Sequence, residues 1–281
     1  MERMQRQSAT YRAMFGEPQF DPPPYPFSRG RSGSVISSSS SLQSQQHREL
    51  VDVPSSSPPQ YNKICQPGAM GPDVPALPKD SLVLVTGANS WQGMHIVDQL
   101  LEHGYRVRGA VRDAEKAIST VKYFTNKYGA GQYTTAVIPD MIPQGAYDIA
   151  ARGCSGLIHV ASIMTFSPDP NEVITPSIAG VLNALEAAAK EPNMKRFVYC
   201  SAAAAAVSQG TGMRNEVTNE SWNMSAFKTA WEAPPPYDAD RAWAVFSSSK
   251  MQAEQTVWRW YHARRPQFAL NTGRLGQFRT L

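Results

Sequence analysis

The sequence is poor in cysteine and contains no long hydrophobic run. Its three cysteines, Cys65, Cys154 and Cys200, form no Cys-x-x-Cys pair, so neither a disulfide framework nor a metal site is indicated. No window approaches the roughly 18 apolar residues of a membrane-spanning helix, and no apolar stretch follows the N-terminal arginines as a secretory signal requires. Basic residues exceed acidic ones by only 27 to 23, which does not predict nucleic-acid binding. We therefore expect a cytoplasmic protein with no metal and no membrane or nucleic-acid partner.

Proline and serine are concentrated at the N-terminal end of the chain. The first 80 residues hold 12 of the 22 prolines together with 13 serines, including the unbroken run Ser37–Ser41. A segment this poor in apolar residues cannot offset its ordering entropy by burial, so we predict a disordered tail over residues 1–80. A regulatory phosphorylation tail is the alternative, although no specific motif supports it.

From Ser81 onward, short apolar strands alternate with amphipathic helices. Six strands are expected, at residues 81–86, 106–111, 133–138, 156–160, 196–200 and 268–272. Helices are expected just before Gly104 and at residues 114–126, 146–151, 172–190 and 246–262. This alternation predicts an α/β fold of the Rossmann type, a doubly wound parallel sheet with flanking helices. We assign residues 81–272 to this NAD(P)-binding domain. Residues 273–281 do not follow its pattern of strands and helices.

Small residues occupy the turn between the first strand and the first helix, TGANSWQG at residues 86–93. A dinucleotide-binding loop needs them, because its backbone turns tightly and its N–H groups approach a pyrophosphate at the positive end of the helix. Gly87, Asn89, Ser90 and Gly93 are therefore candidate cofactor-binding residues. Ser90 stands where a glycine is expected and adds bulk beside the phosphates. The alternative interpretation is a helix cap with coincidental glycines.

Two cations follow the second strand, with Arg112 at its tip and Lys116 one helical turn later. An acidic residue at the strand tip favours the ribose hydroxyl of NAD, whereas cations favour the 2′-phosphate of NADP. NADP(H) is therefore favoured over NAD(H). Asp113 argues against this, since it could pair with Arg112 or cap the next helix, and a solvated charged cap is the structural alternative.

Several motifs occur in the order typical of one enzyme family. Their sequences are TGANSWQG (86–93), HIVDQLLEHGYRVRGAVRD (95–113), HVAS (159–162), EVITPSIAGVLNALEAAAKEPNMKRFVYCS (172–201) and WAVFSSSKMQAEQ (243–255). With these motifs the chain resembles the extended short-chain dehydrogenases/reductases of the NAD(P)-dependent epimerase/dehydratase group. Among these it is most similar to dihydroflavonol reductases and to yeast and fungal aldehyde or methylglyoxal reductases. The resemblance covers about residues 81–272.

The resemblance implies roles for individual residues. Asp140 and Met141 match the pair that holds the adenine. Residues 159–162 match the segment that lines the cofactor, which makes Val160, Ala161 and Ser162 candidate binding residues. Arg112 and Lys116 match the 2′-phosphate binders of the NADPH-using members. Lys250 matches the lysine that holds the nicotinamide ribose.

The sequence departs from the family at two catalytic positions. Members pair the lysine with a tyrosine four residues earlier, which acts as acid toward the carbonyl, and with a serine at the end of the fifth strand. Here Phe246 stands at the tyrosine position, and phenylalanine has no proton to give. The serine position falls on Ala202, and a one-residue shift that used Ser201 would turn that side chain away from the site. Loss of general acid–base catalysis costs about 10²–10⁴-fold in rate.

The expected function is therefore an NADP-dependent oxidoreductase that reduces a small-molecule aldehyde or ketone, impaired in catalysis. We expect the C-terminal substrate lobe of the family to be truncated in this chain. The alternatives are a non-catalytic NADP-binding protein and a truncated, inactive gene product. The identity of the substrate and the oligomeric state stay open.

Overall fold

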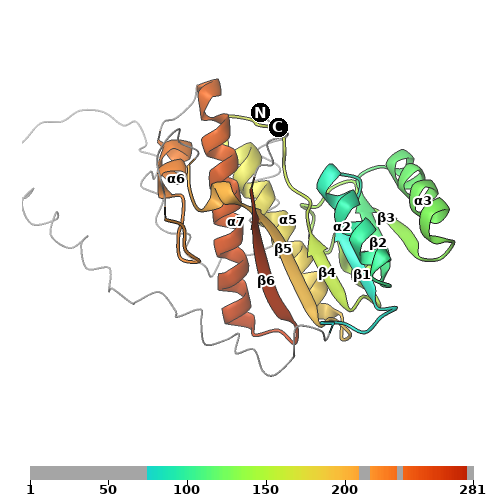
Figure 1. Cartoon of the computed structure of the whole chain (residues 1–281). Coiled ribbons are helices and arrows are strands. Elements are labelled where there is room, and N and C mark those ends of the chain that lie inside the picture. Colours follow the sequence, from blue (N-terminus) through green and yellow to red (C-terminus); the bar gives the residue numbers. More distant parts are fainter. Residues whose placement is uncertain (1–74, 209–215, 233–236, 277–281) are drawn as a thin grey trace, which may run out of the picture. The chain divides into compact units, whose positions relative to one another are not determined.

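The computed structural model describes residues 75–208, 216–232 and 237–276, all of which belong to the compact unit Ala69–Leu281. Its centre is a sheet of six parallel strands in the order β3-β2-β1-β4-β5-β6 (Figure 1). The strands are β1 (Leu82–Thr86), β2 (Arg106–Val111), β3 (Tyr133–Val137), β4 (Gly156–His159), β5 (Arg196–Ala202) and β6 (Ala269–Leu275). This order confirms the predicted doubly wound sheet. It reverses between β1 and β4, and such a switch point is where open α/β sheets bind ligands.

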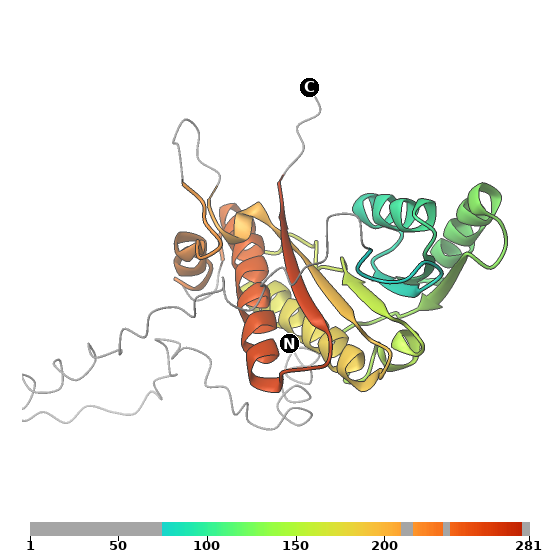
Figure 2. The ribbon, with the colours of Figure 1, turned by 60° about the horizontal axis from the view of Figure 1, so that its bottom comes forward.

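Helices cover both faces of this sheet. The long ones are α2 (Trp91–Glu102), α3 (Ala114–Tyr128), α5 (Pro170–Lys190) and α7 (Ala242–Arg264). The shorter ones are α4 (Asp148–Ala151), α6 (Met224–Trp231) and the 3-10 turns η2 (Ala203–Ala205) and η3 (Ala239–Arg241). Helices α2 and α3 pack on one face, and α5 and α7 pack on the other (Figure 2). In the part of the chain that the structure describes, no helix is long and apolar enough to span a membrane.

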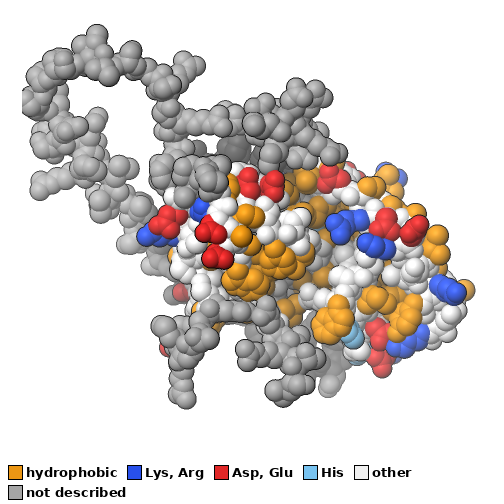
Figure 3. All heavy atoms as spheres, turned by 90° about the horizontal axis from the view of Figure 1, so that it is seen from above, with side chains coloured by type: hydrophobic (Ala, Val, Ile, Leu, Met, Phe, Trp, Pro, Cys, Tyr) orange, Lys and Arg blue, Asp and Glu red, His pale blue; other side chains and the backbone are white. Residues whose placement is uncertain are grey.

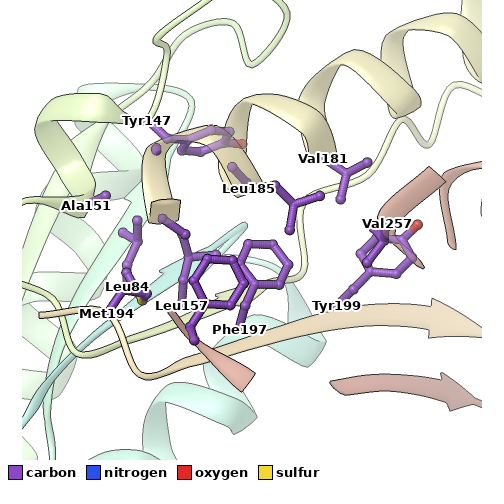
Figure 4. Packing of buried hydrophobic residues seen from close by; sticks show 14 of the residues in the cluster. Leu84, Tyr147, Ala151, Leu157, Val181, Leu185, Met194, Phe197, Tyr199 and Val257 are labelled. Carbon is purple, nitrogen blue, oxygen red and sulfur yellow. The ribbon is translucent and has the colours of Figure 1, made fainter. Parts of the chain in front are cut away.

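The two layers follow from the alternation of side chains along each strand. Val83 and Val85 of β1 join the core beneath α2 and α3, whereas Leu84 between them joins the core beneath α5 and α7. In that second core, Leu84 packs with Phe197 and with Leu185 of α5, as Figure 4 shows. Both faces of the strand are buried, which explains why β1 is a continuous apolar run.

The C-terminal strand is longer than predicted. Strand β6 extends to Leu275, and Gly273, Arg274 and Leu275 lie opposite Cys200, Ser201 and Ala202 of β5. Residues 273–275 therefore continue the sheet, although the sequence analysis placed them off the pattern. Residues 277–281 lie outside the described part.

Two further features were not predicted. Helix α6 is capped by Asn223, whose side-chain oxygen accepts a hydrogen bond from the backbone N–H of Ala226 at 3.0 Å.

The predicted disordered tail lies outside the described residues as far as residue 74. Residues 75–80, which the prediction included in that tail, are described by the structure. Leu77 is buried beside Val83, and its carbonyl accepts a hydrogen bond from the Tyr105 hydroxyl at 3.2 Å.

Candidate functional site

The predicted cofactor-binding residues follow the carboxyl ends of four strands. The loop at residues 87–93 follows β1, Arg112 follows β2, Asp140 comes shortly after β3, and residues 160–162 follow β4. Because all the strands are parallel, these ends lie at one edge of the sheet. Lys250 of α7 reaches the same edge, where its ammonium donates to the carbonyl oxygen of Cys200 in β5 at 3.4 Å. The fold thus brings the predicted residues to one place.

Two glycines give the loop after β1 its shape. Gly87 has a φ of +65°, and a Cβ there would lie 3.1 Å from the backbone of Ala161 after β4. A Cβ on Gly93 would lie 2.2 Å from the carbonyl oxygen of Gly87, which no side chain can accept. The loop therefore brings the backbones after β1 and β4 close together at the start of α2, where small residues are typical of a pyrophosphate site.

The side chain of Ser90 is engaged within the loop. It is the N-cap of α2, and its hydroxyl accepts from the backbone N–H of Gly93 at 3.0 Å and donates to the carbonyl of Gly87 at 2.7 Å. The two hydrogen bonds of Ser90 therefore stabilise the tight turn at a position where the family pattern has a glycine. The neighbouring Asn89 is half-buried.

Thr86 joins the ends of β1 and β4, a role that the sequence analysis missed. Its hydroxyl oxygen accepts from the backbone N–H groups of Val160 and Ala161, both at 3.0 Å, and lies 3.1 Å from Nδ1 of His159. The hydroxyl and Nδ1 share one hydrogen bond, which together with the two backbone N–H groups holds the ends of β1 and β4 together. Burial, with a smaller effect of the Lys250 charge, lowers the pKa of His159 to about 3, so the ring is neutral. The neutral pair fixes the segment that leads to Ser162.

At the end of β2, Asp113 caps the next helix. Its carboxylate accepts from the backbone N–H of Lys116 at 2.8 Å and forms an ion pair with the ammonium of Lys116 at 3.3 Å. The hydrogen bond from that N–H and the positive charges of Lys116 and Arg112 lower the pKa of Asp113. Arg112 is exposed at the strand tip. Of the two alternatives for Asp113, the structure therefore shows the helix cap.

The loop after β3 carries Asp140 and Met141. Asp140 is exposed, and its carboxylate accepts from the backbone N–H of Ile142 at 2.9 Å. Met141 is half-buried and lies against Gly180 of α5. The Asp140 side chain is therefore exposed at the carboxyl end of the sheet, whereas the Met141 side chain packs against the core.

Lys250 is a buried cation between aromatic rings. Its side chain lies over the rings of Tyr199 and Phe246, with Nζ 5.8 Å and 6.0 Å from their centroids. Burial is the main effect on its pKa and lowers it to about 8, although Cys200 and Glu254 oppose this. A lysine held in this way can present its ammonium to a ligand at the edge of the sheet.

The two residues at the end of β5 differ in what they can offer. Ser201 is buried, and its hydroxyl donates to the carboxylate of Glu254 at 2.6 Å. Ala202, the next residue, is half-buried and closes the strand opposite Leu275. The Ser201 proton is thus directed to the buried carboxylate of Glu254.

Phe246 belongs to an aromatic cluster at the start of α7, which we define as Phe166, Trp243 and Phe246. The ring centroid of Phe246 lies 5.5 Å from that of Phe166 and 5.3 Å from that of Trp243. Phe166 has a φ of +51° and is 43% exposed, so a strained and open residue forms one side of the cluster. Seen from above in Figure 3, the surface of the described residues carries several groups of hydrophobic side chains, drawn in orange.

Glu254, one turn after Lys250 on α7, carries a buried carboxylate that was not predicted from the sequence. Glu254 accepts from Thr272 at 2.9 Å and from Nε of Arg274 at 3.1 Å, in addition to Ser201. Arg274 also donates to the carbonyl of Ser221 at 2.9 Å and lies 4.5 Å from the centroid of the Trp222 ring. The network ties α7 to β6 and to the segment before α6. The spacing of Lys250 and Glu254, one turn apart on a helix, was the available signal.

The cavities and the candidate site lie in different places. A cavity of about 440 Å³ lies along α3 and is lined in part by Ile118 and Lys122, and another of about 430 Å³ is lined in part by Ile158 and Val198. Neither is lined by the glycine loop or Lys250. Among residues 75–208, 216–232 and 237–276, no group of three His, Cys, Asp or Glu side chains could hold a metal.

Comparison with known proteins relates the chain to reductases. It is 42% identical to aldehyde reductase 2 of Sporidiobolus salmonicolor over 200 residues, which are 71% of this chain and 58% of that protein. It is 40% identical to the NAD-dependent epimerase/dehydratase terH of Aspergillus terreus over 196 residues, 70% of this chain and 57% of that protein. The matches thus span little more than half of the relatives' length.

Solved structures show the same similarity in three dimensions. The yeast methylglyoxal/isovaleraldehyde reductase Gre2, complexed with NADPH, matches 69% of this chain and 57% of its own, with 25% identity and a TM-score of 0.59. The model of the NAD dependent epimerase/dehydratase family matches residues 83–230, which include the glycine loop and the strands β1 to β5. On this sequence match and the shared fold, the chain belongs to the NAD dependent epimerase/dehydratase family.

Proposed function

We propose that the chain binds NADP(H) at the carboxyl edge of its sheet and belongs to an oxidoreductase that reduces small-molecule carbonyl compounds. The observation that carries the proposal is the loop after β1, where Gly87 has a φ of +65° and lies tightly against the backbone of Ala161, and where Gly93 has no room for a Cβ beside the carbonyl of Gly87. Such a cradle at the switch point fits a pyrophosphate, which needs close approach to backbone N–H groups. The names of aldehyde reductase 2 and of the Gre2 complex with NADPH support the choice of reaction and cofactor.

The proposed cofactor contacts follow the order of the strands. The loop from Gly87 to Gly93, with Asn89 and Ser90, would hold the pyrophosphate, and Val160, Ala161 and Ser162 would line the path toward the nicotinamide. Arg112, with Lys116, would contact the 2′-phosphate, Asp140 and Met141 would contact the adenine, and Lys250 would hold the nicotinamide ribose. When bound, the nicotinamide supplies the hydride. The protein's own residues orient it, and Thr86, which is hydrogen-bonded to the neutral His159, holds the backbone of Val160 and Ala161 in place.

Proton supply is the weak part of this site. Phe246 has no ionisable proton, and the Ser201 hydroxyl already donates to Glu254. Lys250 is buried and has a pKa of about 8, so it is mostly protonated near neutral pH. The phenol beside it, that of Tyr199, is buried, and burial raises the pKa of this phenol, so it is a poor proton donor. This arrangement predicts slow reduction. It also favours a second candidate, a protein that binds NADPH without turnover.

We also propose the boundaries and location that the sequence suggests. Residues 81–272 form the proposed nucleotide-binding domain, with β6 continuing to Leu275. A cytoplasmic location is proposed from the small number of cysteines and the lack of a Cys-x-x-Cys pair.

The test is a titration of the purified chain with NADPH and NADH, followed by turnover with a panel of aldehydes and ketones. We expect NADPH to bind more tightly than NADH, and Gly93→Ala to abolish binding of both. Reduction above the uncatalysed rate would support the reductase, and tight binding without turnover would support the second candidate. If neither nucleotide binds, both are wrong.

A further inference from the structure

The loop between β3 and α4 is held in place mainly from outside. It runs over residues 138–147 and has few backbone hydrogen bonds of its own, such as those from Ala146 N–H to the carbonyl of Pro143 and from Asp148 N–H to that of Gly145. Its first residue, Ile138, is tied to β2 through the carbonyl of Val111 at 2.7 Å. Three carbonyl groups in the rest of the loop, at residues 141–143, find their donors on another element.

Asn183 of α5 supplies those partners. Its side chain is 2% exposed, and Nδ2 donates to three consecutive carbonyls, those of Met141 and Ile142 at 2.8 Å and of Pro143 at 3.0 Å. One amide group, with two N–H bonds, thus serves three acceptors. The spacing fixes the peptide planes on both sides of Ile142.

Gly180 makes a second contact one turn earlier on the same face of α5. A Cβ at this position would lie 2.6 Å from the sulfur of Met141 and 2.9 Å from its Cγ. The absent side chain therefore leaves room for Met141. Helix α5 holds the backbone of Met141 through Asn183 and its side chain through Gly180, and the ion pair of Lys190 with Asp148 at 2.7 Å ties α4 to the same helix.

We infer that Asn183 is a positioning residue for the adenine end of the nucleotide. The inference rests on the proposed function, in which Asp140 and Met141 contact the adenine. The helix pre-forms the loop before the nucleotide arrives, so binding does not have to order it, and a pre-ordered loop binds more tightly than a mobile one. Aspartate and leucine are similar in size to asparagine, but neither side chain at position 183 could donate a hydrogen bond to the three carbonyls.

Three variants at two positions, 183 and 180, test the inference from different directions. Asn183→Ala removes the donors, and Asn183→Ser keeps one hydroxyl donor in case the alanine variant does not fold. Gly180→Ala removes no hydrogen-bonding group, and its added methyl group would displace the side chain of Met141. Because alanine has a higher helix propensity than glycine, this variant should not destabilise α5 itself. The control is Ser177→Ala, a buried position on the same helix whose hydroxyl donates only to the helix backbone, at the carbonyl of Val173.

The measurements are the dissociation constants for NADPH, for its adenine fragment 2′,5′-ADP and for reduced nicotinamide mononucleotide, together with thermal melts. For Asn183→Ala we expect about tenfold weaker binding of NADPH and 2′,5′-ADP, with an intermediate effect for Asn183→Ser. Gly180→Ala should weaken the same two ligands without lowering the melting temperature. Binding of the mononucleotide should not change, and Ser177→Ala should behave as the wild type.

The outcomes separate this inference from the proposed function. If the wild type binds no nicotinamide nucleotide, the proposed function is wrong and the inference is wrong with it. If the wild type binds NADPH and the variants at 183 and 180 bind it equally well, only the inference is overturned. An equal loss for Ser177→Ala, or a loss of mononucleotide binding, would overturn it as well, because the effect would then be a general disturbance of α5.

Discussion

The ammonium nitrogen of Lys250 lies 6.0 Å from the centroid of the Phe246 ring, one turn away on α7. Residues four positions apart share one face of a helix, so the ring and the buried cation are neighbours. Positions 246 and 250 have the spacing of a tyrosine–lysine pair, and the ring at position 246 has no hydroxyl.

Phe246→Tyr should restore a proton donor. The Lys250 charge would lower the pKa of the new phenol and make it an acid, and we expect turnover of a carbonyl substrate to rise by about 10²-fold or more. Phe246→Leu, which removes the ring without adding a donor, is the control. Steady-state oxidation of NADPH with an aldehyde panel measures the effect, and an unchanged rate for the tyrosine variant would show that the ring does not face the reacting carbonyl.

Lys250 should make stability depend on pH. In the folded protein its pKa is about 8, below the ordinary value of 10.5, so the folded state holds this proton less tightly than the unfolded state. Below about pH 8 both states are protonated and the burial cost is complete. Between pH 8 and 10.5 the folded protein loses the proton first, so the free energy of unfolding rises with pH.

Lys250→Met tests this pH dependence, since it keeps the length of the side chain and removes the charge. We expect the variant to be more stable than the wild type by roughly 1–3 kcal/mol at pH 7, a difference that shrinks as the pH approaches 10.5. Urea denaturation of both proteins at several pH values measures it. A difference that stays constant with pH would contradict the buried charge.

Arg112 and Asp113 should have opposite effects on cofactor choice. Arg112→Ala removes the exposed cation at the tip of β2, and we expect NADPH to bind roughly 10- to 100-fold more weakly and NADH to be unaffected. Asp113→Asn keeps the N-cap but frees Lys116 from its ion pair, so it should tighten NADPH binding. Titration with the two nucleotides decides the matter, and an equal loss of NADH affinity in Arg112→Ala would mean that the arginine does not recognise the 2′-phosphate.

Glu254 should matter for stability more than its hydrogen-bond partner Ser201. Glu254→Ala leaves the guanidinium of Arg274, with a side chain only 16% exposed, without its carboxylate, and we expect a loss of about 3–5 kcal/mol. Ser201→Ala removes one hydrogen bond and should cost about 1 kcal/mol. Urea denaturation compares the two variants with the wild type, and similar losses for both would show that the ion pair contributes little.

Much of the fold follows from local pattern. The continuous apolar run at residues 82–86 and the stripe on α5 are properties of neighbouring residues, and their order along the chain defines the parallel sheet. The end of β6 was predicted too early, because Gly273 and Arg274 have no apolar pattern. Their place in the strand comes from pairing with β5 and from the bond of Arg274 to Glu254, twenty residues away.

The sequence by itself determined the sheet, the glycine loop and the absence of a phenol at position 246, because each depends on residue type and spacing. Only the tertiary structure decided where individual protons and charges are directed. The Ser201 hydroxyl faces Glu254, Asp113 caps α3, and Asn183 holds a loop some forty residues away in the chain. The physical reason is that a hydrogen bond or an ion pair requires two groups within about 3 Å, and folding alone brings distant residues that close.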